Sequence, residues 1–202
     1  MELLLIRHGQ SRGNEESIVQ GQLDSGLSEF GENQAEKLKN YFNHGDISSI
    51  YSSTLCRAIQ TATPTAKKLN LEINLDSDLQ EAHFGIWEGL TEHEVKEKYN
   101  KEYTDWHKDY FIRPHWFEAF DKHQSRVKKT VEKILQSHKH SDKVAVFTHG
   151  GSIKTQIGYF QKLNGKELAN FSLSNCSLTL ISFNHSGKYD EGKIIYYNKK
   201  VL

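Results

Sequence analysis

Two short apolar runs, each ended by a His-Gly pair, are the strongest constraint on the fold of this chain. The first run covers residues 3–6 and stops at Arg-His-Gly, 7–9, and the second covers 144–147 and stops at Thr-His-Gly-Gly, 148–151. Short runs of Val, Ile and Leu that stop at glycine are typical of strands buried on both faces of a sheet. Helical patterns lie between these runs, and the alternation predicts an α/β fold: a three-layer sandwich whose mostly parallel central sheet is flanked by helices.

Other elements follow from local patterns. Ser28 is a plausible N-cap for a helix with apolar residues at 35, 38, 41 and 42. The remaining predicted elements are a strand end at 50–53, a helix that carries Arg57, a helix through 127–135, and a terminal hairpin of 177–183 and 194–197 around Ser-Gly-Lys, 186–188. No repeat or linker divides the sequence, so we expect a single domain spanning 1–202.

The composition argues against several classes of protein. Lys plus Arg and Asp plus Glu each number 26, so the formal net charge is zero and no nucleic-acid partner is expected. Two cysteines, Cys56 and Cys176, rule out a disulfide scaffold, and there is no Cys-x-x-Cys pair for zinc. No apolar run approaches about 18 residues, and the first residues do not resemble a signal peptide. We therefore expect a cytoplasmic protein with no membrane partner.

The chemically useful residues lie at the predicted strand ends. Ligands of open α/β sheets bind at the carboxyl ends of strands, so His8 and His149 would converge if their strands are neighbours. Arg7 and Arg57 would add two guanidinium groups, and the glycines, including Gly150, would expose backbone N–H groups. Two arginines and two histidines in one pocket suit a phosphate dianion.

A phosphate pocket of this kind predicts phosphoryl transfer. A neutral imidazole such as His8 is nucleophilic near pH 7 and can accept a phosphoryl group, while the arginines and His149 stabilise its charge. Glu81 can give a proton to the leaving alkoxide if burial favours its protonated form. Each residue alone has an ordinary alternative, because single histidines are usually surface or core residues and single arginines are usually surface charges.

Five ordered sequence blocks resemble the histidine phosphatase superfamily, which includes phosphoglycerate mutases and small phosphatases. They are Leu-Ile-Arg-His-Gly-Gln-Ser-Arg-Gly-Asn at 5–14, Gln-Gly-Gln-Leu-Asp-Ser-Gly-Leu-Ser at 20–28 with Gly-Glu-Asn-Gln-Ala at 31–35, Tyr-Ser-Ser-Thr-Leu-Cys-Arg-Ala-Ile-Gln-Thr-Ala at 51–62, Leu-Gln-Glu-Ala-His-Phe-Gly-Ile-Trp-Glu-Gly at 79–89, and Phe-Thr-His-Gly-Gly at 147–151. The resemblance implies that His8 is the phosphorylated nucleophile and that Arg7 and Arg57 clamp the phosphoryl group.

The resemblance also implies roles for other positions. It makes His149 the second pocket histidine and Glu81 the acid that protonates the leaving group. Asn14, Gln20 and Gly21 fall where the family contacts phosphate or substrate. The family uses no metal, and we expect no cofactor.

Departures from the family pattern fall outside the predicted phosphoryl pocket. Gln10 replaces the commoner Glu, Gly13 stands where mutases usually carry an aromatic residue, and the segment 113–120 lacks the Gly-Glu-Ser that small phosphatases often have. These differences leave the substrate-side wall uncertain.

The segment from about 82 to 123 is expected to form a helical insertion over the active site. It is dense in aromatic residues, which suits either a satellite core or a ligand wall. Trp106, Trp116 and Phe117 would then favour an apolar or aromatic phosphoester.

The favoured function is a metal-independent phosphatase acting on a small phosphomonoester. The basic insertion that mutases carry is absent, which favours a phosphatase over a mutase. The alternatives are mutase-type transfer, a non-catalytic phosphate-binding member of the fold and an unrelated metal hydrolase. The sequence carries no signal for a particular oligomeric state.

Overall fold

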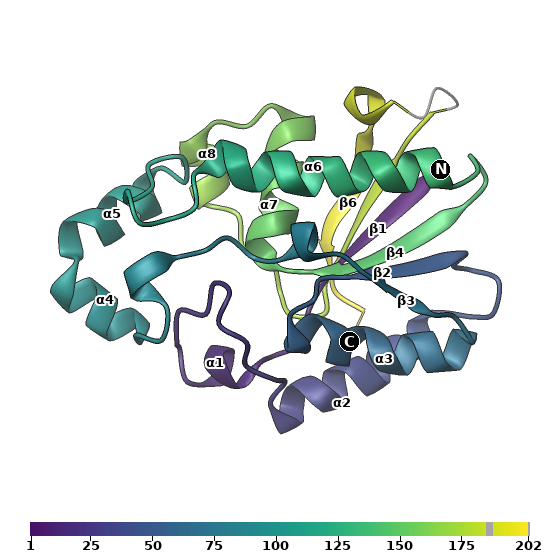
Figure 1. The fold of residues 1–202 in the computed structure, drawn as a ribbon, viewed down its shortest axis with the longest axis horizontal. Coiled ribbons are helices and arrows are strands. Elements are labelled where there is room, and N and C mark those ends of the chain that lie inside the picture. Colours follow the sequence, from purple (N-terminus) through teal and green to yellow (C-terminus); the bar gives the residue numbers. More distant parts are fainter. Residues whose placement is uncertain (185–187, 202) are drawn as a thin grey trace.

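A six-stranded sheet runs through the centre of the protein (Figure 1). The computed structural model describes residues 1–184 and 188–201. In sheet order the strands are β3 (Ile73–Leu75), β2 (Ser49–Ser52), β4 (Lys143–Thr148), β1 (Glu2–Arg7), β5 (Leu178–Ser182) and β6 (Lys193–Lys199). The first four are parallel to one another, whereas β5 is antiparallel to both β1 and β6. The predicted mostly parallel α/β fold and the terminal antiparallel pair are confirmed, while Ser186 and Gly187 of the predicted turn lie outside the described residues.

Helices cover both faces of this sheet. The helices α2 (Glu29–Leu38) and α3 (Cys56–Leu69) pack on one face, and α6 (Phe120–Ser137) and α7 (Gly150–Gln161) pack on the other (Figure 1). Alternate residues of β1 explain the two layers. Leu3 and Leu5 belong to the core cluster beneath α6 and α7, whereas Leu4 and Ile6 belong to the cluster beneath α2 and α3. The strand is therefore buried on both faces, as its unbroken apolar run predicts.

The shorter elements occupy the connections. They are the helices α1 (Arg12–Glu15) and α8 (Gly165–Ala169) and the 3-10 turns Lys39–Tyr41, Ser77–Leu79, Gly85–Trp87 and Tyr189–Glu191. Within residues 1–184 and 188–201, no helix has both the length and the apolar character needed to cross a membrane.

The aromatic-rich segment lies beyond one end of the sheet. Its helices α4 (Glu92–Lys98) and α5 (Asn100–Lys108) lie on the side toward which β1 and β4 run (Figure 1). A third cluster forms here around the buried side chains of Trp87, Val95 and Phe117. The segment is therefore partly helical and has a small core of its own.

Helix α2 is anchored to the loop that follows β1. Ser28 is its N-cap, as predicted: its hydroxyl accepts from the Gly31 N–H at 3.1 Å and donates to the side chain of Gln10 at 2.7 Å. A Cβ atom on Gly31 would lie 1.9 Å from the carbonyl oxygen of Gln10. Glycine at this helical position thus permits a close approach between the helix and the loop.

We expect Gly31→Ala to lower the free energy of unfolding by about 1–3 kcal/mol, the usual range for overpacking. Alanine improves helix propensity by about 1 kcal/mol, but the collision with Gln10 forces the helix away from the loop. Denaturant unfolding would measure the change, with the exposed Glu32→Ala on the same helix as the control. A Gly31→Ala protein as stable as the wild type would contradict this close packing.

Candidate active site

The two predicted His-Gly pairs lie side by side. Strands β1 and β4 are parallel neighbours whose register pairs Arg7 with Thr148, so the next residues, His8 and His149, follow at the same level. The His8 N–H donates to the Thr148 carbonyl at 3.0 Å, and the two imidazole ring centres are 5.2 Å apart. The histidines meet at the carboxyl ends of adjacent strands, where ligands of such sheets bind.

His8 presents a neutral ring with a free nitrogen. Its Nδ1 lies 2.7 Å from the Gly9 carbonyl oxygen, which can only accept, so Nδ1 carries the hydrogen and Nε2 keeps its lone pair. Burial, together with the charges of Arg7 and Arg57, holds the pKa of His8 well below its ordinary value. The imidazole is therefore uncharged at neutral pH, and its Nε2 can act as a nucleophile.

Buried Arg57 and half-buried Arg7 lie close enough to lower the pKa of His8. Arg57 donates from its Nη atoms to the carbonyls of Gly21 at 2.7 Å and Leu23 at 2.8 Å, and Arg7 donates to the Leu173 carbonyl. The buried Nε atoms of both arginines have no hydrogen-bond partner among the described residues. Since an unpaired buried donor is costly, this arrangement suits an incoming anion that accepts from both guanidinium groups.

A cavity of about 440 Å³ opens beside these groups. Of the residues predicted to form the site, its lining includes Arg7, His8, Asn14, Gln20, Gly21, Arg57 and Glu81. The aromatic segment supplies another wall through Phe84, Trp87, Val95, Tyr103, Trp106 and His107. Most of the predicted residues thus surround one space.

His149 and Gly150 lie immediately behind this lining. His149 is fully buried, and its Nε2 is 2.8 Å from the Ser53 hydroxyl at the end of β2. Burial, with Arg57 and then His8, lowers the pKa of His149 well below its ordinary value. A Cβ atom on Gly150 would lie 3.5 Å from the Arg7 Nε, an ordinary van der Waals contact, so Gly150 lies directly against that side chain. His149 and Gly150 thus lie next to His8 and Arg7 without lining the cavity.

Glu81 reaches the cavity from the segment after β3. Its Oε2 accepts from the Gly151 N–H at 2.8 Å and its Oε1 from the Ala82 N–H at 2.9 Å. The first bond ties the carboxyl group to the N-terminal turn of α7, which begins at Gly150. Because the side chain is 13% exposed, it can still exchange a proton with a bound molecule.

A buried histidine lies behind Glu81. The Nε2 of His123 is 2.9 Å from the Ser152 hydroxyl and 3.9 Å from the Glu81 Oε1. Since the Ser152 hydroxyl donates its hydrogen to the Gln80 carbonyl, His123 must donate from Nε2. Burial, followed by Arg126 and Arg113, holds the pKa of His123 well below its ordinary value.

Sequence reasoning missed Arg126, the residue that fixes the backbone of Glu81. This side chain on α6 donates to the carbonyls of Asp78, Gln80 and Glu81 at 2.6–2.9 Å. It also makes a two-pronged ion pair with Glu118, at 2.7 and 2.8 Å. Such a fork locks the Glu81 segment against α6. The only sequence signal was the separation of eight residues between Glu118, just before α6, and Arg126 within it. No known motif has that spacing.

Two further residues that sequence reasoning missed hold the loop after β1. The Thr61 hydroxyl accepts from the Gly9 N–H at 2.9 Å and donates to the Arg57 carbonyl, four residues earlier in α3, at 2.7 Å. The Asn175 amide donates to the His8 carbonyl at 3.0 Å. These bonds join His8 and Arg57 through one short network.

The structure explains two departures from the family pattern. The Gln10 amide oxygen accepts from Ser28, so this side chain supports α2. A Cβ atom on Gly13 would lie 2.5 Å from the side chain of Gln20, whose own oxygen accepts from the hydroxyls of Ser11 and Ser25 at 2.7 and 2.6 Å. Glycine at position 13 therefore leaves space for Gln20 at the cavity wall.

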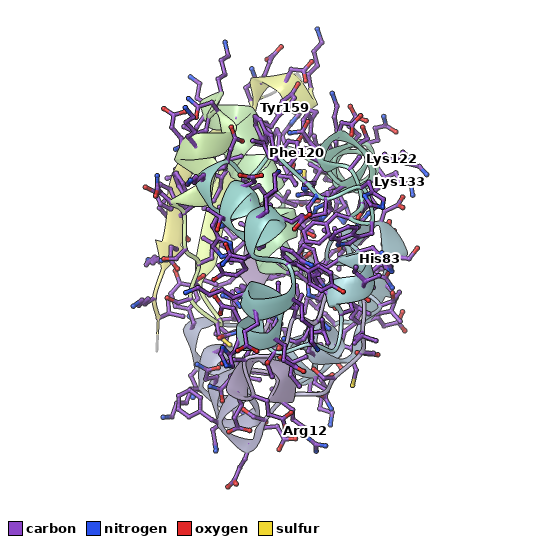
Figure 2. All side chains as sticks on the ribbon, turned by 90° about the vertical axis from the view of Figure 1, so that its left-hand side faces the viewer. Arg12, His83, Phe120, Lys122, Lys133 and Tyr159 are labelled. Atoms are coloured by element: carbon purple, nitrogen blue, oxygen red, sulfur yellow. The ribbon has the colours of Figure 1, made fainter. Side chains whose placement is uncertain are left out.

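His83 follows Glu81 closely in sequence but does not face the cavity. Its side chain is 51% exposed, and its Nδ1 accepts from the Gly85 N–H. Figure 2, which turns the side of α4 and α5 toward the viewer, shows His83 on one flank of the molecule, below Lys122 and Lys133. In the part of the chain that the structure describes, no group of three or more His, Cys, Asp or Glu side chains is arranged to hold a metal ion.

Comparison with known proteins identifies relatives of the whole described fold. The family model for the histidine phosphatase superfamily (branch 1) matches residues 3–191, which include both His-Gly pairs. A bifunctional protein of Mycobacterium tuberculosis is 33% identical over 186 residues, which are 92% of this chain and 51% of that protein. The chain thus spans about half the length of the first relatives that it matches.

Two relatives of similar length are phosphatases. Phosphoserine phosphatase 1 of Hydrogenobacter thermophilus is 29% identical over 182 residues, covering 90% of this chain and 86% of that protein. The structure of mycobacterial glucosyl-3-phosphoglycerate phosphatase in complex with VO3 matches with a TM-score of 0.89 and 27% identity, covering 98% of this chain and 99% of that one. These likenesses support phosphatase activity in general.

Because three buried histidines are neutral in the folded protein, we expect acid to lower its stability. His8, His123 and His149 have lowered pKa values when folded, so below about pH 6.5 the unfolded chain binds protons that the folded protein does not. The free energy of unfolding should therefore fall with pH, by up to about 4 kcal/mol per pH unit for three protons. Denaturant unfolding at pH 7.5, 6.5 and 5.5 would measure this slope.

A variant can isolate one of these protons. His123→Gln should reduce the slope by about 1.4 kcal/mol per pH unit, the value for a single proton. The same substitution at the exposed His44 separates the effect of burial from the loss of a histidine. A wild-type stability that stays constant from pH 7.5 to 5.5 would contradict the lowered pKa values, because the folded protein would then bind as many protons as the unfolded chain.

Proposed function

The chain belongs to the histidine phosphatase superfamily, and on that premise we propose that it is a phosphomonoester phosphatase that forms a phosphohistidine on His8. The observation that carries the proposal is the free Nε2 of a neutral His8 in a cavity that also holds Arg7, Arg57 and Glu81. The phosphatases among its relatives support the same reaction class. We propose that residues 1–202 form one catalytic domain.

In the first step, the His8 Nε2 attacks the phosphorus of the bound ester. A nitrogen–phosphorus bond forms as the bond from phosphorus to the alcohol oxygen breaks. Glu81 in its protonated form gives its proton to that oxygen, and the alcohol leaves. Arg7 and Arg57 hold the phosphoryl oxygens through N–H groups that include the unpaired Nε atoms.

In the second step, water attacks the phosphohistidine. The ionised Glu81 accepts a proton from the water as the oxygen–phosphorus bond forms and the nitrogen–phosphorus bond breaks. Inorganic phosphate leaves, and His8 and Glu81 return to their initial states. The guanidinium pair supplies the positive charge for both steps, so we propose that the reaction needs no metal ion.

The charges of the cavity favour hydrolysis over mutase-type transfer. A mutase must retain a bisphosphorylated acid and keep water away from its intermediate. The charged side chains lining this cavity are two arginines and two glutamates, Arg7, Arg57, Glu81 and Glu92. Once the arginines hold one phosphoryl group, this lining offers no further arginine or lysine for a second. A single phosphomonoester is the better match.

Removing the nucleophile tests the mechanism directly. We expect His8→Ala to lose at least about a thousandfold in kcat with p-nitrophenyl phosphate, since a catalytic nucleophile is removed. Because phosphohistidine is labile in acid, the wild-type enzyme should be quenched in alkaline denaturant, and mass spectrometry should then find an added phosphoryl group on His8. Assays in EDTA and a His93→Ala control, which alters a 79% exposed histidine, complete the design. Substantial turnover by His8→Ala would overturn the proposal.

Glu81 should matter most when the leaving group is poor. Glu81→Gln keeps the size of the side chain and an oxygen for the Gly151 N–H but cannot donate a proton as an acid. We expect kcat/KM for alkyl phosphates to fall about 10²–10⁴-fold, the usual range for general acid catalysis, and to fall far less for p-nitrophenyl phosphate. Equal losses with both classes of ester would mean that Glu81 is not the proton donor.

A further inference from the structure

The side of the cavity away from the phosphoryl pocket is built from aromatic rings. Phe84, Tyr103 and Trp106 are half-buried and line it, and the rings of Phe84 and Trp106 lie 5.6 Å apart. His107 stacks on Tyr103, with ring centres 3.9 Å apart and an angle of 32° between their planes. This wall therefore offers aromatic surfaces to the alcohol part of a bound ester.

One carboxylate accompanies these rings. Glu92 is the first residue of α4 and lines the cavity, and its Oε1 accepts from the hydroxyl of Tyr103. The two arginines of the lining are engaged by the phosphoryl group in the mechanism above, and Glu81 serves as proton donor. Glu92 is thus the charge that the lining has left for the alcohol part of the substrate.

Aromatic surfaces beside a carboxylate are the features that attract an organic cation. The face of an aromatic ring carries partial negative charge, and a ring and an ammonium group attract by about 0.5–2 kcal/mol. A second anionic group at the same place would meet the charge of Glu92 instead. The local chemistry selects by charge as well as by shape.

We propose that the substrate is a phosphomonoester whose alcohol carries a positively charged nitrogen and no carboxylate, with that nitrogen held between the aromatic wall and Glu92. The inference rests on the proposed phosphatase function and adds a substrate class to it. The class differs from phosphoserine and glucosyl-3-phosphoglycerate, the substrates named for two relatives, because both of those molecules contain a carboxylate.

A competing arrangement would use Lys154. This residue of α7 lies outside the lining, with its Nζ 4.9 Å from the centre of the Tyr110 ring. Burial lowers its pKa to about 8, and the Glu81 carboxylate opposes that shift. If Lys154 turned toward the cavity it would attract a carboxylate, so the two arrangements predict opposite preferences.

A panel of esters that differ in charge distinguishes them. We would measure kcat/KM for phosphocholine and phosphoethanolamine, and for 3-phosphoglycerate and O-phosphoserine. Glycerol 1-phosphate, whose alcohol part is uncharged, serves as the reference. Phosphocholine should exceed 3-phosphoglycerate by at least tenfold in the wild type. Glu92→Gln should reduce that ratio three- to tenfold, and Glu92→Lys should reverse it. The control is Glu97→Gln, an exposed carboxylate elsewhere on α4, which should leave the ratio unchanged.

The outcomes separate this inference from the proposed function. If the enzyme forms phospho-His8 and hydrolyses p-nitrophenyl phosphate but Glu92→Gln keeps the wild-type ratio, the substrate class is wrong and the phosphatase function stands. A preference for carboxylated esters that disappears in Lys154→Met would also overturn the class and assign the selectivity to Lys154. If no ester is hydrolysed and no adduct forms, both proposals fall.

Discussion

The parallel pairing of β1 with β4 is the constraint on which the rest of the site depends. Its register pairs Arg7 with Thr148 and so delivers His8 and His149 to one level, at the end of the sheet where the glycines let the chain turn away. A shift of one residue would send every side chain of β1 to the opposite face and move Leu3 and Leu5 out of their core. The packing of the core therefore enforces the geometry of the pocket.

The pocket concentrates positive charge that the fold itself only partly satisfies. Arg57 is buried, Arg7 is half-buried, and both donate to backbone carbonyls, yet among the described residues the Nε–H of each has no partner. Keeping such groups out of water costs stability, and an anion that accepts from them recovers part of that cost. Burial, together with these charges, holds the pKa values of His8 and His149 well below their ordinary values, so both rings are neutral. The charges that would bind a phosphoryl group therefore also help to keep the proposed nucleophile neutral, even though the net charge of the chain is zero.

The sequence predicted the residues that share a strand end but not those that act across the fold. Apolar runs and glycines located β1 and β4, and the spacing around Ser28 located α2, because these signals are local. Arg126 and Thr61 work through backbone carbonyls and amides of segments far away in the sequence, so no spacing announces them. The aromatic wall was foreseen only in part: Trp106 lines the cavity, while Trp116 and Phe117 pack behind it because they fill the small third core.

Within the described residues, Arg126 joins the aromatic segment to Glu81 but makes no hydrogen bond to His8 or Arg57. Its fork to Glu118 ties the end of the aromatic segment to α6, and its bonds to the Gln80 and Glu81 carbonyls tie the proposed proton donor to the same helix. His8 and Arg57 are held separately, through Thr61 on α3. A change in the aromatic segment can therefore move Glu81 without moving His8. Variants there should alter the leaving-group step before they alter phosphoryl binding, which is the behaviour expected of a wall that selects the alcohol.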